Sequence, residues 1–450
     1  MLLALLACET ATVDPLGDST TDRPQDSAAH DTAEPIGGDA GLLPVLSITL
    51  DTQPIPEDEK VGGQLEVIRP QSTSLDGLEE DVRTLTTAVG IQVHGSSSTG
   101  YPKKGFRIEL RDAFGADLKQ PIVGMPAGSD FVLHAPYSDK TLVRNALAYT
   151  LARSITDAWH PRSQLVELFI DGDYQGVYLL VERVRRADDR VDLPSPADSP
   201  ETGDITGGYI VRIEQHRNEG WDTARGTPID YFHPRYEELT PEQTTYLHEW
   251  FNGFEDDLAE EGWQELWPHL IETRAWVDHF LINELANNID AYRLSAYLFK
   301  EPDAEGGRLH AGPVWDFDRA FGNVNYCGTW ATTGFVIDHL TACGYGSQYP
   351  FWWKQLLSDP AFTEALQCRW QELREDELSA GELINTLTRL VQSLEHAEPR
   401  DHEVWPVIGE DVSPNYQVFA TYEEEVQFLE AWVVERARWL DDNLPGECPE

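Results

Sequence analysis

The stretch LVELFI (165–170), DGDYQG (171–176) and VYLLVERV (177–184) places a short polar turn between two apolar runs. Runs of this kind, bounded by Asp and Gly, predict two strands joined by a hairpin. Further strand patterns lie on both sides of it, at 46–50, 64–68, 89–93, 106–110, 131–133 and 208–214. One helix is expected among them, over 141–155.

The second half of the chain has a different periodicity. From residue 240 onward apolar side chains recur at helical spacing, which predicts helices at 241–260, 273–287, 350–357, 361–374, 380–397 and 423–443. A hairpin within 295–318 interrupts them. A strand-rich N-terminal half followed by a helix-rich C-terminal half indicates the α+β class, and two lobes with a cleft between them would suit that order.

Composition excludes several classes of protein. The chain has 450 residues, 41% of them hydrophobic, which is enough for a large core and excludes wholesale disorder. Its 33 basic and 79 acidic residues give a net charge of −46. Such a charge repels nucleic acids and favours cations or basic proteins as partners. No apolar run reaches the roughly 18–20 residues that a membrane-spanning helix needs.

The N-terminus suggests export. Residues 1–8, MLLALLAC, look like the end of a secretion signal, and LLAC (5–8) resembles a bacterial lipobox, which implies a lipid on Cys8. No basic segment precedes this run, so an upstream start or an ordinary terminus remains an alternative. Residues 9–42 have the composition of a disordered acidic tether, and one folded domain is expected over 43–445. The prediction is an exported protein, lipid-anchored at the cell surface or in the periplasm.

Four further cysteines are even in number and form no Cys-x-x-Cys pair. In an exported protein, Cys327–Cys343 with Cys368–Cys448 is the most local of three possible pairings. In the cytosol the same residues would be reduced core thiols.

The loop at 94–105, HGSSSTGYPKKG, is a candidate anion site. Small residues such as Ser97 let backbone amides approach a phosphate, and Lys103 and Lys104 could neutralise its charge. The loop is not a Walker A sequence, and a surface turn with two solvated lysines is the alternative.

Three aspartates are expected to meet near the hairpin at 295–318. If Lys300 pairs near Arg308, Asp290 falls opposite Asp318, and strand alternation places Asp316 and Asp318 on one side. Oxygen donors of this kind suit Mg²⁺, Mn²⁺ or Ca²⁺. Solvated acids at a strand end, or a cap after the helix at 273–287, are the alternatives.

Several motifs follow one another along the chain: GSSST (95–99), KKGFRI (103–108), LVRN (142–145), YQGVYLLVE (174–182), GGYI (207–210), NID (288–290) and PVWDFDRAFG (313–322). Together they resemble the spore coat protein CotH kinase family over nearly all of 43–445. The resemblance implies an atypical protein kinase with a divergent, two-lobed kinase-like fold. Such a kinase would move the γ-phosphate of ATP to Ser or Thr hydroxyls of an unidentified protein acceptor, for which the acidic composition favours a basic one.

The resemblance also implies roles by position. Lys104 or Lys103, with Ser97 in the same loop, would meet the ATP phosphates. Asp290 would be the catalytic carboxylate, and Asp316 with Asp318 would hold Mg²⁺ or Mn²⁺.

Two further residues, Arg144 and Glu182, match motif positions in or beside the nucleotide cleft. One position departs from the family: Ser295 stands where many relatives carry Asn, and serine is the weaker metal ligand. The departure, and the scarcity of ATP outside cells, leave two alternatives open. One is a non-catalytic surface binding or adhesion protein that keeps the fold. The other is a structural Ca²⁺ site at Asp316 and Asp318.

Overall fold

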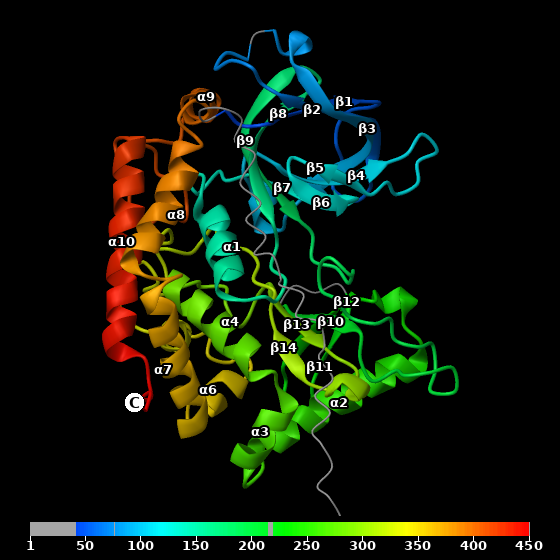
Figure 1. Cartoon of the computed structure of the whole chain (residues 1–450), viewed down its shortest axis with the longest axis vertical. Helices are drawn as coiled ribbons and strands as arrows, with labels where there is room; N and C mark the ends of the chain where they lie inside the picture. The colour runs from blue at the N-terminus through cyan, green and yellow to red at the C-terminus, as the bar shows by residue number, and fades with distance from the viewer. Residues whose placement is uncertain (1–41, 76, 215–218, 450) are drawn as a thin grey trace, which may run out of the picture. The chain divides into compact units, whose positions relative to one another are not determined.

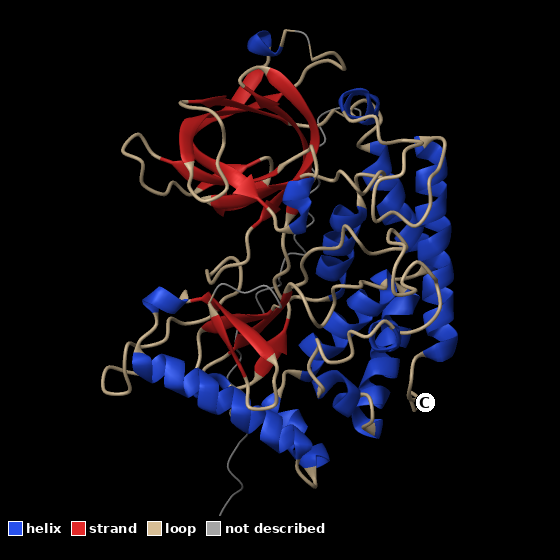
Figure 2. Cartoon of the chain, turned by 180° about the vertical axis from the view of Figure 1, so that it is seen from behind, coloured by secondary structure: helices blue, strands red, loops and turns tan. Residues whose placement is uncertain are grey.

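The computed structural model describes residues 42–75, 77–214 and 219–449. The predicted signal remnant with Cys8, and all of the predicted tether except residue 42, lie outside the described residues. Strands dominate the first half of the described chain and helices the second, as Figure 1 and Figure 2 show. The predicted α+β class is therefore confirmed. No helix among the described residues is long and apolar enough to cross a membrane.

Seven strands close a barrel, in the order β1-β2-β3-β4-β7-β9-β8. They are β1 (Val45–Leu50), β2 (Val61–Arg69), β3 (Val82–His94), β4 (Gly105–Arg111), β7 (Asp130–His134), β9 (Asp173–Glu182) and β8 (Ser163–Ile170). The ladders are antiparallel except the one between β1 and β8, which is parallel and completes the ring. Alternate side chains such as Leu46, Ile48 and Ile108 fill the interior. The sequence predicts these strands but not their closure.

A second sheet has five strands, in the order β11-β12-β10-β13-β14. They are β11 (Gly220–Asp222), β12 (Pro228–His233), β10 (Tyr209–Ile213), β13 (Ala296–Lys300) and β14 (Leu309–Ala311). A small ribbon pairs β5 (Gln120–Ile122) with β6 (Met125–Gly128). In Figure 2 the barrel and the five-stranded sheet are separate β-structures.

The helices are α1 (Arg144–Ile155), α2 (Pro241–Ala259), α3 (Trp263–Leu270), α4 (Thr273–Ala286), α5 (Val336–Ala342), α6 (Trp352–Leu356), α7 (Pro360–Glu375), α8 (Ala380–Gln392), α9 (Glu398–Val404) and α10 (Tyr422–Asn443). The single helix predicted over 380–397 is wrong at its end, because α8 stops at Gln392. A new helix, α9, then starts with Pro399 in its first turn. Helix α3 was not predicted, and it contains Pro268.

One apolar cluster connects the barrel to the helical half. It joins outward-facing residues of β9, such as Val177 and Leu179, to Leu147 of α1, Phe280 of α4 and Val211 of the five-stranded sheet. Both predicted disulfides are present, Cys327–Cys343 and Cys368–Cys448.

The predicted hairpin register is wrong by one residue. Strand β13 pairs Lys300 with Leu309, not with Arg308, and β14 ends at Ala311. Asp316 and Asp318 therefore lie beyond the ladder, and strand alternation does not place them. Asp316 instead has a left-handed backbone conformation (φ 68°).

Candidate functional site

Asp290 lies in the tight turn that follows α4. The helix ends at Ala286, and Asn287 adopts the left-handed conformation (φ 45°) that stops it. The side-chain oxygen of Asn288 accepts a hydrogen bond from the backbone N–H of Asp290 at 3.1 Å. The turn holds Asp290 as a buried side chain, 6% exposed.

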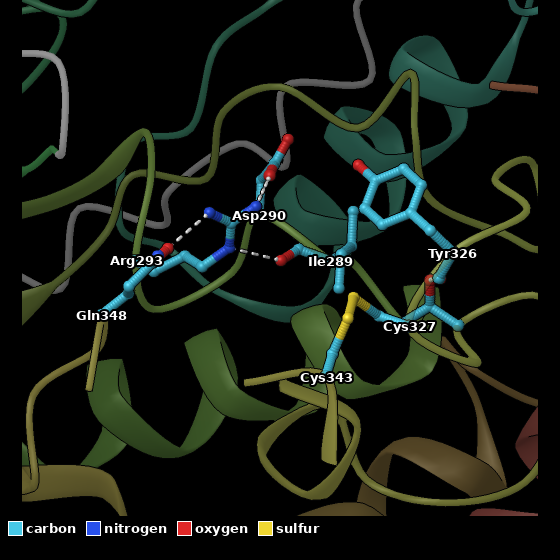
Figure 3. The surroundings of a disulfide bond; sticks show 8 residues. Ile289, Asp290, Arg293, Tyr326, Cys327, Cys343 and Gln348 are labelled. Atoms are coloured by element: carbon cyan, nitrogen blue, oxygen red, sulfur yellow. Dashed lines mark hydrogen bonds and ion pairs between the residues drawn. A yellow bond between two sulfur atoms is a disulfide. The ribbon is translucent and has the colours of Figure 1, made fainter. Parts of the chain in front are cut away.

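Two arginines face the Asp290 carboxylate. Arg293 donates from Nη2 to Oδ1 at 2.8 Å, and Nη1 of Arg319 lies 3.9 Å from Oδ2. Arg293 also donates to Gln348 at 3.1 Å, as Figure 3 shows. Burial raises the pKa of Asp290, while Arg293 and Arg319 oppose that rise. The carboxylate is therefore held in one orientation by positive charge.

The segment that carries Asp316 and Asp318 is anchored on α1. Tyr149 accepts a hydrogen bond from the Asp316 N–H at 3.2 Å, and Asn145 accepts one from the Phe317 N–H at 2.7 Å. The Phe317 side chain is fully buried. This anchoring fixes the two acids on either side of a buried aromatic residue.

The charges of these acids interact. Burial raises the pKa of the Asp316 carboxyl well above its usual range, and the nearby charges of Asp318 and Asp290 raise it further. Arg319 opposes the rise. The three predicted acids therefore do lie near one another, although the hairpin register does not bring them together.

Arg319 links these acids to the loop at 94–105. It donates from Nη2 to Oγ of Ser97 at 2.7 Å, and Ser97 begins a short 3₁₀ turn, Ser97–Gly100. Burial alone would lower the pKa of Arg319, but the carboxylates of Asp290, Asp318 and Asp316 raise it. Arg319 thus contacts both Ser97 and Asp290, and it also senses the charges of Asp316 and Asp318.

The two adjacent lysines point to different places. Lys103 is buried, with Nζ 2.6 Å from Oδ1 of Asp401 in α9 and 5.3 Å from the centre of the Tyr178 ring. Burial lowers the pKa of Lys103, and the charge of Asp401 opposes that change. Lys104 donates to the carbonyl oxygen of Thr99, within the loop.

Arg144 and Glu182 each belong to a separate buried ion pair. Arg144 donates from Nη1 to Asp139 at 2.6 Å. Glu182 accepts two hydrogen bonds from the guanidinium of Arg162, at 2.7 and 3.0 Å. Neither side chain is among those joined by Arg319. Ser295 immediately precedes β13 and is left-handed (φ 50°).

A disulfide borders the site. Figure 3 shows Asp290, Arg293, Tyr326 and the Cys327–Cys343 bond gathered around Ile289. Burial raises the pKa of Tyr326 to about 12, the charge of Asp290 adds to the rise, and Arg319 opposes it. The disulfide therefore fixes the segment that carries Tyr326 beside Arg319.

The acids differ in what they offer a metal ion. Among the described residues no group of three or more His, Cys, Asp or Glu side chains is placed to hold a metal ion. Asp316 and Asp318 remain a pair of oxygen donors, and Mg²⁺ is often bound by one or two carboxylates together with substrate phosphates. The pKa of Asp316, raised in part by the charge of Asp318, would be relieved by a cation, which fits that donor chemistry.

Sequence reasoning did not assign Arg293, Arg319, Asn145 or Tyr149. Arg319 directly follows Asp318 in the quoted motif, and Arg293 is three residues after Asp290. Basic residues this close to candidate acids were an available signal for both arginines. No local pattern marks Asn145 or Tyr149, since their partners lie far along the chain.

A comparison with protein families identifies the chain. The family described as CotH kinase protein matches residues 91–440, which include the loop at 94–105 and all three candidate aspartates. The chain belongs to the CotH kinase protein family. A search of curated proteins gives no match.

Membership in the CotH kinase family implies an atypical kinase that uses ATP, with a kinase-like fold. The two disulfides point to an oxidising compartment outside the cytosol.

Proposed function

We propose that this CotH kinase family member transfers the γ-phosphate of ATP to Ser or Thr hydroxyls of a protein acceptor, with Mg²⁺ or Mn²⁺. The observation that supports the proposal most is the contact of Arg319 with both Ser97 and Asp290. This contact joins a small-residue loop to an oriented carboxylate, and the charges of Asp316 and Asp318 act on the same arginine. Phosphoryl transfer needs positioning, charge neutralisation and a base near the hydroxyl.

In this proposal Asp290 receives the proton of the acceptor hydroxyl. Its pKa, raised by burial, makes it a better proton acceptor than a solvated aspartate, and Arg293 fixes its orientation. Asp316 and Asp318 would hold the divalent cation, which when bound neutralises phosphate charge. Ser97 and Lys104 would border the phosphates from the loop.

Three remaining candidates act indirectly in this proposal. Lys103 is held by Asp401 in a buried ion pair, and kinases also require an internal lysine–carboxylate pair. Arg144 and Glu182, each in a buried ion pair, would keep the nucleotide-side backbone in place. The barrel would then be one lobe of a kinase-like fold and the helical half the other.

The proposal also covers location. A signal remnant at 1–8, a tether over 9–42 and a kinase domain over 43–445 would give an exported protein anchored by a lipid on Cys8. The two disulfides support export.

The test is transfer of labelled phosphate from ATP to a basic protein or to the chain itself, with Mg²⁺ or Mn²⁺. Asp290→Asn keeps the shape of the side chain and should abolish transfer. Asp256→Asn changes an exposed aspartate of α2 and is the matched control. Equal labelling by the wild type and Asp290→Asn would contradict the proposal.

A non-catalytic surface binding protein is the second candidate. Export to a compartment where ATP is scarce favours it, as does Ser295 in place of Asn. Binding of ATP without any transfer under all metal conditions would support this candidate.

A further inference from the structure

Five arginines gather in a protein that is otherwise strongly acidic. They form what we call the arginine cluster: Arg107 of β4, Arg183 and Arg185 just after β9, Arg212 of β10 and Arg235 just after β12. Burial, together with the charges of Arg107 and Arg235, lowers the pKa of Arg183 to about 10, while Asp130 and Tyr297 oppose the change. With a net charge of −46 for the chain, such a concentration of positive charge is a local exception.

The cluster is formed by residues of both β-structures. The guanidinium of Arg183, beside the barrel, lies 5.8 Å from the centre of the Phe232 ring. The guanidinium of Arg212, from the five-stranded sheet, lies 5.6 Å from the centre of the same ring. Phe232 is therefore shared by two cations, of which Arg212 also pairs with Asp230 and Glu214.

Four of the five arginines have a carboxylate partner. The carboxylate of Asp130 faces Arg107 at 3.7 Å, Arg185 at 3.1 Å and Lys60 at 4.0 Å. Arg212 pairs with Asp230 and Glu214, and Arg235 lies 3.8 Å from Glu237. The carbonyl oxygen of Arg183 accepts a hydrogen bond from Arg190 at 2.7 Å, but the Arg183 side chain makes no hydrogen bond or ion pair with any residue that the structure describes. The Nε of Arg107 is buried and lacks a hydrogen-bond partner within the described residues. Donors left in this state cost free energy unless a ligand accepts from them.

The cluster is continuous with the acidic site. His94 remains exposed, yet burial together with the charges of Arg183 and Arg107 lowers its pKa to about 4. Its position is therefore recessed but open to water. His134 also lowers the pKa of His94. Burial lowers the pKa of His134 itself, and the charge of Asp318 opposes that change. Asn145 lies 3.0 Å from His134 and accepts a hydrogen bond from the N–H of Phe317. Phe317 stands between Asp316 and Asp318 in the chain.

We propose that the arginine cluster binds the phosphate chain of a nucleoside triphosphate. This inference rests on the proposed kinase function, and it assigns the main phosphate contacts to Arg183 and Arg107 rather than to Lys103. The Nζ of Lys103 is bound to Asp401, whereas the Arg183 guanidinium and the Nε of Arg107 have no hydrogen-bond partner among the described residues. Guanidinium groups match phosphate oxygens in charge and geometry. A polyphosphate next to Asp316 and Asp318 would neutralise the cluster.

The test measures ligand binding by calorimetry on the full chain. ATP, AMP and inorganic tripolyphosphate are titrated into the wild type, Arg183→Gln and Arg107→Gln. Each substitution should weaken ATP and tripolyphosphate about tenfold and AMP much less. Arg83→Gln, at the opposite end of β3 from His94, is the matched control and should bind like the wild type.

Three results would overturn the inference. The first is unchanged ATP affinity in both cluster variants. The second is loss of tripolyphosphate binding with ATP binding intact, which would make inorganic polyphosphate the ligand. The third is reduced transfer to the acceptor with unchanged ATP affinity, which would assign the cluster to the acceptor protein.

The same experiment separates this inference from the kinase proposal. A wild type that binds ATP through the cluster but never transfers phosphate leaves the inference standing and removes the kinase. Transfer with an unchanged KM for ATP in both cluster variants removes the inference and leaves the kinase proposal standing.

Thermal unfolding gives a second measurement. Arg183→Gln removes repulsion and breaks no hydrogen bond among the described residues, so its Tm should equal or exceed that of the wild type. A purely structural arginine would lower the Tm. Arg183→Lys should restore part of the ATP affinity, because it restores the charge.

Discussion

Two arginines of this protein show opposite uses of the same side chain. Arg436 of α10 is completely buried and donates to the carbonyl oxygens of Glu284 and Gly334, at 2.7 and 2.6 Å, and to the Glu284 carboxylate at 3.1 Å. Arg183 has no such acceptors among the described residues and lies next to other cations. The difference indicates that Arg436 stabilises the fold, whereas the side chain of Arg183 is available to bind a ligand.

The largest effect is expected at Arg436. Arg436→Ala leaves Glu284 as a buried carboxylate without its cation and should lower the free energy of unfolding by about 3–5 kcal/mol. Denaturant unfolding measures this, with Arg438→Ala, an exposed position on the same helix, as the control. A loss below about 1 kcal/mol would mean that the pairing contributes little and would weaken the comparison.

An intermediate effect is expected from two buried histidines, His160 before β8 and His279 in α4. Burial lowers the pKa of His160 to about 3 and that of His279 to about 4. Both pKa values are depressed from about 6.5, so the unfolded chain binds more protons and stability falls as the pH drops from 6.5 toward 4. His279→Gln should shrink the loss of stability between pH 7 and pH 5 by about 2 kcal/mol.

Unfolding curves at the two pH values check this prediction, and the exposed His269→Gln is the control. Glu284 gives stability the opposite pH dependence. Burial raises its pKa to about 7, so its contribution to stability is lost as the pH rises from about 4.5 to 7. Greater stability at pH 5 than at pH 7 would show that Glu284 outweighs the histidines.

The smallest effect is expected at Asp130, the shared carboxylate of the arginine cluster. Asp130→Asn should lower the free energy of unfolding by only about 1 kcal/mol, because its ion pairs are partly exposed. It should also tighten tripolyphosphate binding several-fold by removing a competing anion. Calorimetry compares the affinities of the wild type and Asp130→Asn for tripolyphosphate. Glu66→Gln, which changes the partner of Arg83, is the control. Weaker tripolyphosphate binding would contradict the role given to the cluster.

The sequence predicted what depends on local pattern. The strands of the barrel, most helices and the more local disulfide pairing follow from periodicity and spacing, and α2 and α4 end within one residue of the predicted positions. Closure of the barrel could not be predicted, because the β1–β8 ladder pairs Val45 with Glu167. No local signal specifies partners so far apart.

The site was predictable only in part. Asp290, Asp316 and Asp318 were found from their motifs and do lie near one another, yet the register that was meant to join them is wrong by one residue. Turn geometry at 301–308 decides that register, and composition alone does not fix it. The arginine cluster was missed for a different reason: its five members come from four separate segments, and each is an ordinary basic residue in its segment.

The parallel β1–β8 ladder has a consequence for how this chain is made. Synthesis delivers β1 early, but its final neighbour emerges only after β2, β3, β4 and β7 are complete. Until then one edge of the incomplete sheet stays open to pairing with other chains. Contacts so distant in sequence also slow acquisition of the native state. A nascent chain stalled before residue 163 should therefore be the most prone to aggregate.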